Sequence, residues 1–348
     1  MVILLGLTLL NATWLAPTPA GKPKLIAHRG VYHLYDKRAA FGRDTCTARF
    51  IRPPDHEVFE NTIASIQMAA GLGGDMVEID VAPTKDGKMV LFHDWTVDCR
   101  TNGKGETRDL TLAELKALDI GYGYTADGGK TFPLRGKGIG QIPTVEEALA
   151  ALPSRPLLFN FKSKTPDEAD QLFAILKASG RDYEKLGDAF YGGQRPVDRI
   201  RQLAPKNWAF NMKNEAKSCT KDYVLYGWTG IVPESCRNGV LVIPINYQWP
   251  MWGWPNRLIA RMESVGAKII VVGPHESGKS NEGLSDVHDL GKIPASYNGY
   301  IWVEDISAIG PALNRYDFSF TQRRGGRGDL GAPVTLEPKA CRAHTSSA

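Results

Sequence analysis

The stretch that decides the fold is Met-Val-Glu-Ile-Asp-Val at residues 76–81, a short apolar run that carries two carboxylates. Side chains alternate between the two faces of a β-strand, so Glu78 and Asp80 lie on one face and the apolar residues between them on the other. Such apolar flanks are typical of a strand that is covered on both sides. Two buried carboxylates on one face would repel each other, and a bound hard cation with oxygen ligands would remove that repulsion.

Similar short apolar runs recur along the chain and predict further buried strands. Helical patterns lie between several of them, at 61–70, 111–118, 144–152 and 167–179. The expected strands are 24–27, 76–81, 89–92, 157–161, 208–210, 240–245, 268–272 and 300–303. Eight strands interleaved with helices predict an α/β fold, a (β/α)8 TIM barrel, with a long insertion after the first strand at residues 31–59.

Length and composition favour one large domain. The chain has 348 residues, of which 43% are hydrophobic, and we expect the barrel to occupy 21–325 and a flexible tail 326–348. The net charge of +4 arises from well-mixed acids and bases. This charge is too mild and too dispersed to indicate a nucleic-acid partner, but it suits an anionic small-molecule substrate. Nothing in the sequence indicates an obligate protein partner.

The first twenty residues carry no charged side chain, and small residues at 16–20 precede the first lysine, Lys22. This pattern predicts a signal peptide at 1–20, although the usual positive N-terminal region is missing. A buried first strand is the alternative interpretation. A signal peptide implies a secreted or periplasmic protein.

The five cysteines agree with export. We expect disulfides between Cys46 and Cys99 and between Cys219 and Cys236, with Cys341 unpaired. Spacing alone does not fix this pairing, since four cysteines allow three connectivities, and reduced buried cysteines are the alternative. A bridge between Cys46 and Cys99 would pin the insertion beside the strand that leads to His93.

Polar residues stand at the ends of the first four expected strands. His28-Arg29 follows the first, the acid pair lies on the second, His93-Asp94 follows the third, and Asn160 and Lys162 share a face of the fourth. In TIM barrels the functional residues gather at the C-terminal ends of several strands. Each motif alone is weak, and their joint placement is what indicates an active site.

With these motifs in order, the chain resembles the glycerophosphodiester phosphodiesterase family. The resemblance is dense from Leu25 to about Lys162 and thin afterwards, apart from 299–305, which is similar to the family's last strand. It rests on His28-Arg29-Gly30, Glu60-Asn61-Thr62, Glu78-Ile79-Asp80-Val81, Thr84-Lys85-Asp86-Gly87, His93-Asp94, Asp109-Leu110-Thr111, Glu114-Leu115 and Ile142-Pro143-Thr144.

The resemblance implies a TIM barrel, one divalent cation (Ca²⁺ or Mg²⁺) and metal-dependent hydrolysis of a glycerophosphodiester to glycerol phosphate and an alcohol. Imidazoles near pKa 6.5 suit general acid/base catalysis, and a cation with an arginine suits phosphate charge. The residues carried over are His28 and His93 as general acid and base, Glu78 and Asp80 as metal ligands, and Arg29, Lys162, Glu60 and Asn61 as substrate-binding or supporting groups.

Two features depart from the family. Asn160 stands where the family has a third acidic ligand, so we expect it to ligate the metal weakly, through a neutral amide oxygen. The insertion 31–59 replaces a short loop and places Tyr32, His33, Tyr35 and Arg43 near the barrel mouth. Small glycerol-headed substrates are therefore not the only class to consider.

A tryptophan cluster follows the sixth expected strand and bears on substrate class. Trp249, Trp252 and Trp254 could grip an acyl chain or meet a membrane surface, or they could form a packed aromatic loop. One alternative function is therefore a lysophospholipase D or sphingomyelinase D-like phosphodiesterase acting on a lipid-derived substrate. The other is an inactive binding protein on the same barrel, which the presence of both His28 and His93 disfavours.

Overall fold

The computed structural model describes residues 2–35, 45–276 and 282–315. Eight parallel strands form a nearly closed barrel in the spatial order β6-β5-β4-β2-β1-β9-β8-β7. The strands are β1 (Lys24–Ala27), β2 (Met76–Pro83), β4 (Leu157–Phe161), β5 (Ala189–Gly192), β6 (Ala209–Phe210), β7 (Val240–Pro244), β8 (Lys268–Val272) and β9 (Tyr300–Val303). The predicted (β/α)8 barrel is confirmed.

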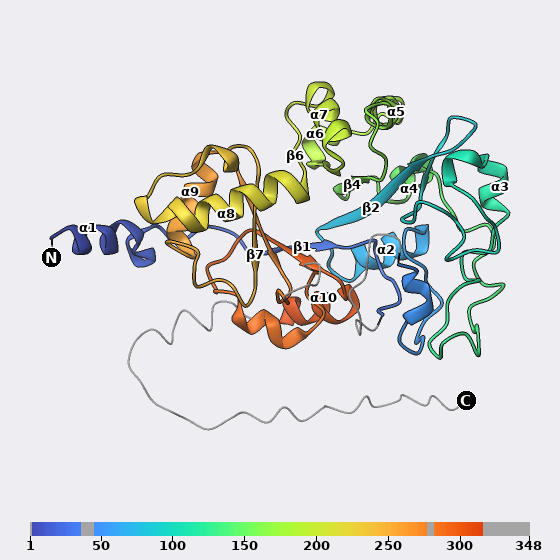
Figure 1. Ribbon diagram of the computed structural model, residues 1–348, viewed down its shortest axis with the longest axis horizontal. Helices are drawn as coiled ribbons and strands as arrows, with labels where there is room; N and C mark the ends of the chain where they lie inside the picture. Colours follow the sequence, from blue (N-terminus) through green and yellow to red (C-terminus); the bar gives the residue numbers. More distant parts are fainter. Residues whose placement is uncertain (1, 36–44, 277–281, 316–348) are drawn as a thin grey trace, which may run out of the picture. The chain divides into compact units, whose positions relative to one another are not determined.

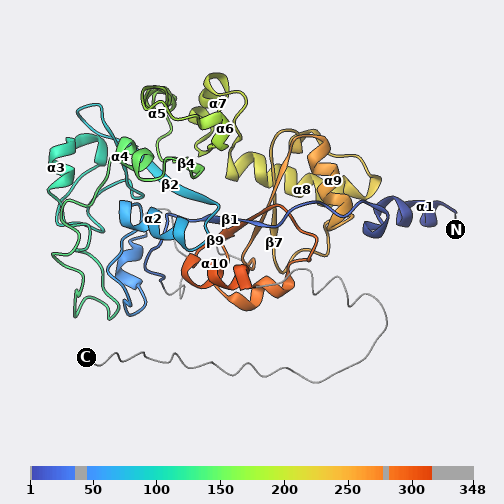
Figure 2. The ribbon, with the colours of Figure 1, turned by 180° about the vertical axis from the view of Figure 1, so that it is seen from behind.

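The helices are α1 (Val2–Asn11), α2 (Ile63–Gly71), α3 (Leu112–Lys116), α4 (Val145–Ala151), α5 (Asp167–Ala178), α6 (Tyr183–Leu186), α7 (Gln194–Leu203), α8 (Lys217–Tyr226), α9 (Asn256–Ser264) and α10 (Ile306–Arg315). Figure 1 shows α4, α5 and α7 outside the strands, and Figure 2 shows the same arrangement from behind. Thr111 and Thr144 each form a capping box with the glutamate three residues on, which starts α3 and α4.

Two of the sequence-based strand assignments need correction. Residues 89–91 form β3 (Met89–Leu91), which pairs antiparallel with β2 and is not a barrel strand. Only five residues separate β2 from β3, enough for a hairpin but too few for the crossover of a dozen or more residues that parallel strands need. The missing barrel strand is β5, which lies in the stretch 180–205, where the sequence predicts no strand.

Strand register places the acid pair inside the barrel. Met76, two residues before Glu78, packs in the inner cluster with Ile26, Leu158 and Trp302. By the two-residue period, Glu78 and Asp80 face the same interior. Alternate positions such as Val77 and Ile79 pack in the outer cluster beneath the helices.

The N-terminal residues form α1 and a short 3₁₀ turn beside α8 and α9 (Figure 1). Asn11 donates to the carbonyl of Trp228 at 2.9 Å, and Arg261 donates to the carbonyl of Leu10 at 3.1 Å. The strand alternative for this segment is therefore wrong, while cleavage of a signal peptide at 1–20 stays a prediction. Among the described residues, no helix is long and apolar enough to cross a membrane.

Both expected disulfides are present, Cys46–Cys99 and Cys219–Cys236. Within the insertion, Tyr35 pairs with Ile51 across an isolated antiparallel bridge, and 47–50 form a 3₁₀ turn. Arg43, Cys341 and the expected tail 326–348 lie outside the described residues.

Candidate active site

The motif His28-Arg29-Gly30 turns sharply out of β1. Arg29 has φ +57° and Gly30 φ +80°, both in the left-handed region. A Cβ on Gly30 would lie 2.2 Å from the Ser65 Oγ, so only glycine fits there. The turn points the Arg29 backbone N–H at Glu78 Oε2, to which it donates at 2.9 Å. A strained residue in this position is typical of functional sites.

The motif Glu60-Asn61-Thr62 lies against this turn. Asn61 also has a positive φ, +59°, and its backbone N–H donates to the carbonyl of Arg29 at 3.0 Å. Its side chain makes two hydrogen bonds to Asp80: it donates to Oδ2 at 2.8 Å and accepts from the Asp80 backbone N–H at 2.9 Å. Glu60 accepts from Arg29 Nη1 at 3.0 Å, and Thr62 caps the start of α2. Glu60 and Asn61 therefore lie within the site, where they contact Arg29 and Asp80.

Glu78 and Asp80 are completely buried, with exposed fractions of 0%. Burial, together with repulsion from Asp80, raises the pKa of Glu78 to about 7. Burial would also raise the pKa of Asp80, but Lys162, His93 and Arg29 hold that pKa well below its usual range. The pKa values of the two neighbouring carboxyls are thus shifted in opposite directions because their surroundings differ.

Asn160 and Lys162 approach Asp80 from β4, the next strand of the barrel. Asp80 and Asn160 are register partners, and the Asn160 amide donates to Asp80 Oδ1 at 2.8 Å. Lys162 Nζ lies 3.3 Å from the same oxygen. The structure therefore brings together Asn160, Lys162 and Asp80, as the sequence predicted.

Each of the two histidines is held at Nδ1 by a carboxylate. His28 Nδ1 lies 2.7 Å from Glu304 Oε2, and His93 Nδ1 lies 2.7 Å from Asp94 Oδ1. Because a carboxylate accepts, each Nδ1 carries the proton and each Nε2 keeps its lone pair. Arg29 Nε donates to His28 Nε2 at 3.2 Å, which agrees with this tautomer.

The electrostatic surroundings of the two imidazoles differ. Burial lowers the pKa of His28, but Glu304 beside it outweighs that effect and leaves the pKa above its ordinary value. Burial, with the positive charges of Arg29 and Lys162, lowers the pKa of His93 to about 4. The site therefore presents two imidazoles of unequal basicity, which is suited to acid/base chemistry.

Four contributors to the site were not assigned from the sequence. Glu304 follows β9, Tyr191 lies on β5 and donates to Glu78 Oε1 at 2.5 Å, and Tyr32 donates to Glu304. Arg100 pairs with both Asp94 and Glu60. A signal existed for Glu304, which stands at the end of an expected strand, but Tyr191 lies on β5, a strand that the sequence does not predict.

The residues expected to hold a cation offer a suitable donor set. Glu78 and Asp80 supply carboxylate oxygens and Asn160 an amide oxygen, the ligand types that Ca²⁺ and Mg²⁺ take. Both Asn160 and Lys162 approach Asp80 Oδ1, whereas the hydrogen bond from Asn61 leaves a lone pair on Oδ2, because each carboxylate oxygen can accept twice. These residues therefore fit a hard cation.

A second group that could hold a metal ion lies in the insertion. The ligand atoms of His33, Asp55 and His56 lie within 4.8 Å of one another. However, His56 Nδ1 accepts from the Val58 backbone N–H, so the ring proton occupies Nε2, and the two imidazoles stack with centroids 4.2 Å apart. This geometry suits a packed aromatic pair better than a metal site, since a ligating histidine donates from its other ring nitrogen.

The tryptophan cluster is split between two environments. Trp249 is 82% exposed and Trp252 is 41% exposed. Trp254 instead packs on Tyr297 and donates to Gln248 Oε1 at 2.8 Å. Trp254 is therefore part of the packed loop, and the expectation that it could meet a lipid is not supported by its position.

A parallel barrel that presents two carboxylate-held histidines, an arginine, a lysine and a buried acid pair at its C-terminal end defines a phosphodiester hydrolase. The sequence pattern of the glycerophosphoryl diester phosphodiesterase family matches residues 28–179. A glycerophosphodiester phosphodiesterase from Caldanaerobacter subterraneus is 40% identical over 215 residues, covering 56% of this chain and 82% of that protein. The chain belongs to the glycerophosphoryl diester phosphodiesterase family.

Other relatives agree with this assignment. A glycerophosphodiester phosphodiesterase from Bacillus subtilis is 33% identical over 139 residues, covering 39% of this chain and 45% of that protein. A phosphodiesterase from Oleispira antarctica, solved with the product sn-glycerol-3-phosphate, shares the fold with a TM-score of 0.53 at 19% identity, covering 84% of this chain and 97% of that one. The second comparison supports the fold alone.

Proposed function

We propose that the protein hydrolyses a glycerophosphodiester to glycerol phosphate and an alcohol, with a divalent cation at Glu78, Asp80 and Asn160. The observation that carries the proposal is the pair of histidines, each fixed at Nδ1 by a carboxylate 2.7 Å away, which makes Nε2 the nitrogen available for proton transfer in His93 and, once the hydrogen bond from Arg29 is exchanged for substrate, in His28. An inactive binding protein would have no need for two such dyads.

Arg29 and Lys162 bind the phosphate in this account. Both already lie near Asp80, with Arg29 Nε at 3.6 Å and Lys162 Nζ at 3.3 Å from its oxygens. Their side chains are only 10% and 21% exposed, so their charges act where solvent screens them weakly. A cation bound by Glu78, Asp80 and Asn160 would supply further positive charge to the non-bridging oxygens.

The two histidines divide the proton transfers. One Nε2 removes a proton from the attacking water as the new P–O bond forms. The other histidine, protonated, gives its proton to the leaving alkoxide as the old P–O bond breaks. Glu304 and Asp94 keep the two rings in the orientation and tautomer that this exchange needs.

A small cavity beside Glu304 is a candidate for the alcohol portion of the substrate. It has a volume of about 230 Å³, and Tyr32, Leu34 and Tyr35 from the insertion line it together with Gly283 and Glu304. The insertion therefore contributes to the shape of the substrate site. The exposed Trp249 and Trp252 are the observation that favours the second candidate, a lysolipid substrate met at a membrane surface.

A substrate panel tests the proposal and separates the two candidates. Purified protein is given glycerophosphocholine, glycerophosphoethanolamine, lysophosphatidylcholine and sphingomyelin, each with Mg²⁺, Ca²⁺ or excess chelator. We expect release of glycerol phosphate from the first two, and its loss with chelator. Faster turnover of the lysolipid would favour the second candidate, and no turnover of any diester with either cation would contradict hydrolysis.

We also propose that the protein is secreted or periplasmic. The apolar α1 with the small residues that follow it, and two disulfides between four of the five cysteines, support export to an oxidising compartment. Mass spectrometry of protein recovered outside the cytoplasm would show an N-terminus near residue 21 and both bridges. Intact N-termini with reduced cysteines would contradict it.

A further inference from the structure

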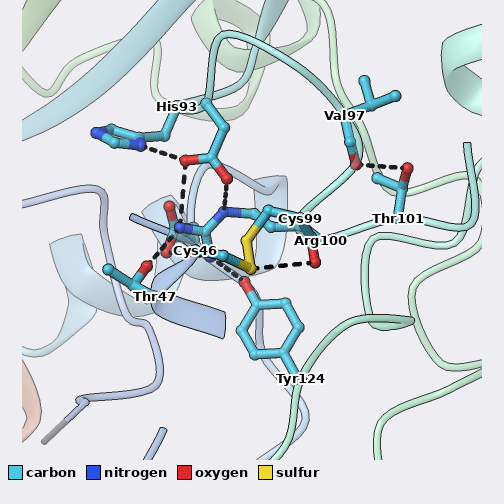
Figure 3. The surroundings of a disulfide bond; sticks show 10 residues. Cys46, Thr47, His93, Val97, Cys99, Arg100, Thr101 and Tyr124 are labelled. Atoms are coloured by element: carbon cyan, nitrogen blue, oxygen red, sulfur yellow. Dashed lines mark hydrogen bonds and ion pairs between the residues drawn. A yellow bond between two sulfur atoms is a disulfide. The ribbon is translucent and has the colours of Figure 1, made fainter. Parts of the chain in front are cut away.

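Arg100 links two carboxylates of the active site, Asp94 and Glu60. Its side chain is 4% exposed and carries carboxylates on two sides, with Asp94 Oδ2 at 2.9 Å from Nε and Glu60 Oε2 at 3.1 Å from Nη1. Figure 3 shows the guanidinium between His93, Thr47 and Tyr124. A planar cation with donors on several edges is suited to holding two carboxylates at once.

The two carboxylates bound by Arg100 are the partners of groups that act in the proposed hydrolysis. Asp94 holds His93 Nδ1 at 2.7 Å, and Glu60 holds Arg29 Nη1 at 3.0 Å. A displacement of Arg100 would therefore change the positions of both His93 and Arg29. Neither contact could be expected from the sequence, where Arg100 follows a cysteine and belongs to no assigned motif.

The Cys46–Cys99 disulfide fixes the backbone on both sides of the Arg100 side chain (Figure 3). Cys99 directly precedes Arg100. Cys46 directly precedes Thr47, whose Oγ1 accepts from Arg100 Nη2 at 2.9 Å. The same guanidinium donates to the Tyr124 hydroxyl at 2.7 Å. Arg100 is therefore held by its own bridged segment at Cys99, by Thr47 and by Tyr124.

We propose that Arg100 is a positioning residue: clamped by the Cys46–Cys99 disulfide, it holds Asp94 and Glu60, and through them orients His93 and Arg29. The inference rests on the proposed hydrolysis and adds to it a residue and a covalent bond that set the geometry. A purely structural ion pair would change the stability of the protein but leave the turnover of folded molecules alone. A positioning role changes the turnover itself, because a small misplacement of reacting groups can cost ~10²-fold.

The first test compares Arg100→Gln with a matched control, Arg181→Gln. The Arg181 side chain is also 4% exposed and pairs with a buried carboxylate, Asp188, at 2.6 Å, but it contacts no active-site residue. Both variants should have a lower melting temperature than wild type. Turnover is measured with glycerophosphocholine as substrate, at a temperature where circular dichroism shows every variant folded. We expect kcat to fall by ~10²-fold only for Arg100→Gln. Equal kcat in Arg100→Gln and Arg181→Gln would overturn the proposal.

Arg100→Lys keeps the test informative if Arg100→Gln does not fold. Lysine keeps the charge but loses the fork that reaches both carboxylates. We therefore expect a folded protein whose kcat lies at least tenfold below that of wild type. Wild-type kcat in Arg100→Lys would contradict the two-carboxylate role.

The second test uses the two disulfides as a matched pair. The double variant Cys46→Ser/Cys99→Ser should lower kcat at least tenfold, whereas Cys219→Ser/Cys236→Ser, which removes a bridge between α8 and the turn before β7, should leave kcat within twofold of wild type. Both should lower the melting temperature, since each loses a covalent constraint. A wild-type kcat without the Cys46–Cys99 bridge would remove the disulfide from the proposal.

A third readout does not depend on turnover. Nitrogen-15 spectra of the His93 ring report which nitrogen carries the proton, and we expect Nδ1–H in wild type and in Arg181→Gln but a mixture of tautomers in Arg100→Gln. If wild type hydrolyses no diester, the proposed function fails and this spectrum alone decides the role of Arg100. An unchanged His93 spectrum in Arg100→Gln would overturn the positioning role.

Discussion

Glu304 Oε2 lies 2.7 Å from His28 Nδ1, although 276 residues separate the two in the chain. The carboxylate is buried, and it also accepts from Tyr32 and, through Oε1, from the Gly283 backbone N–H at 2.8 Å. Burial would raise the pKa of Glu304, but His28 and the donors around it hold that pKa well below its usual range. β1 and β9 are neighbours in the barrel, and their adjacency places this charged acceptor against His28.

Replacing Glu304 should therefore impair His28 without displacing it. Glu304→Gln removes the negative charge and allows the wrong tautomer of His28, and we expect kcat to fall by ~10² to 10⁴-fold. The control is Asp289→Asn, a buried acid of the 287–292 turn that pairs with Lys292 outside the site. Steady-state kinetics on a glycerophosphodiester check this, and a kcat within threefold of wild type in Glu304→Gln would show that the dyad has no catalytic consequence.

The histidines themselves give a second prediction. General acid/base catalysis typically contributes ~10² to 10⁴-fold, so His28→Ala and His93→Ala should each lower kcat by at least the smaller of these factors. Folding and metal content should stay near those of wild type, which circular dichroism and metal analysis would verify. A variant that keeps wild-type turnover would exclude its histidine from the mechanism.

The cation site gives a third. Glu78→Gln and Asp80→Asn should lose metal affinity and activity together, because each removes a charged oxygen ligand. Asn160→Asp adds a charge to the weakest corner and should tighten binding by a measurable factor, while activity need not rise because the charge also repels the diester. Calorimetric titration of metal-free protein with Mg²⁺ and Ca²⁺ measures this. Binding of neither cation by wild type, or full activity in excess chelator, would rule the assignment out.

The sequence was sufficient to predict the barrel and the side of the sheet on which the acids lie. Strand periodicity alone put Glu78 and Asp80 on one face, and the structure places both in the barrel interior, with Asp80 in register with Asn160. The sequence was insufficient where a strand has only a short apolar run. Residues 189–192 form β5, in which three residues precede two consecutive glycines, Gly192 and Gly193. Such a short run does not predict a strand by itself, and β5 forms because it pairs with the neighbouring strands β4 and β6.

Long-range partners were beyond the sequence for a different reason. Glu304 and Tyr191 act on His28 and Glu78 only because β9 and β5 approach them in space. Arg100 was equally hidden, since its position depends on a disulfide and on two carboxylates from different segments. Short sequence motifs indicate which residues can act in acid/base chemistry or ligand binding, whereas the fold determines which distant residues hold them in place.

A buried carboxyl outside the site provides the last prediction, on stability. Glu168, in the first turn of α5, is 2% exposed and accepts from the Ser163 backbone N–H at 2.9 Å. Burial raises its pKa from 4.5 to about 7. Because the folded protein binds this proton more tightly than the unfolded chain, the associated stability is fully present below pH 4.5 and is lost as the pH rises through 7.

Glu168→Gln is neutral at every pH and should therefore remove this dependence. Relative to that of wild type, the free energy of unfolding of the variant should increase by roughly 3 kcal/mol between pH 4.5 and pH 8, so the variant becomes the more stable of the two by that amount. Any constant cost of burying the amide cancels in this difference, as do the other groups that titrate in both proteins. Urea unfolding at several pH values measures it. A difference in stability that stays constant across the range would show that Glu168 has the same pKa in the folded protein as in the unfolded chain.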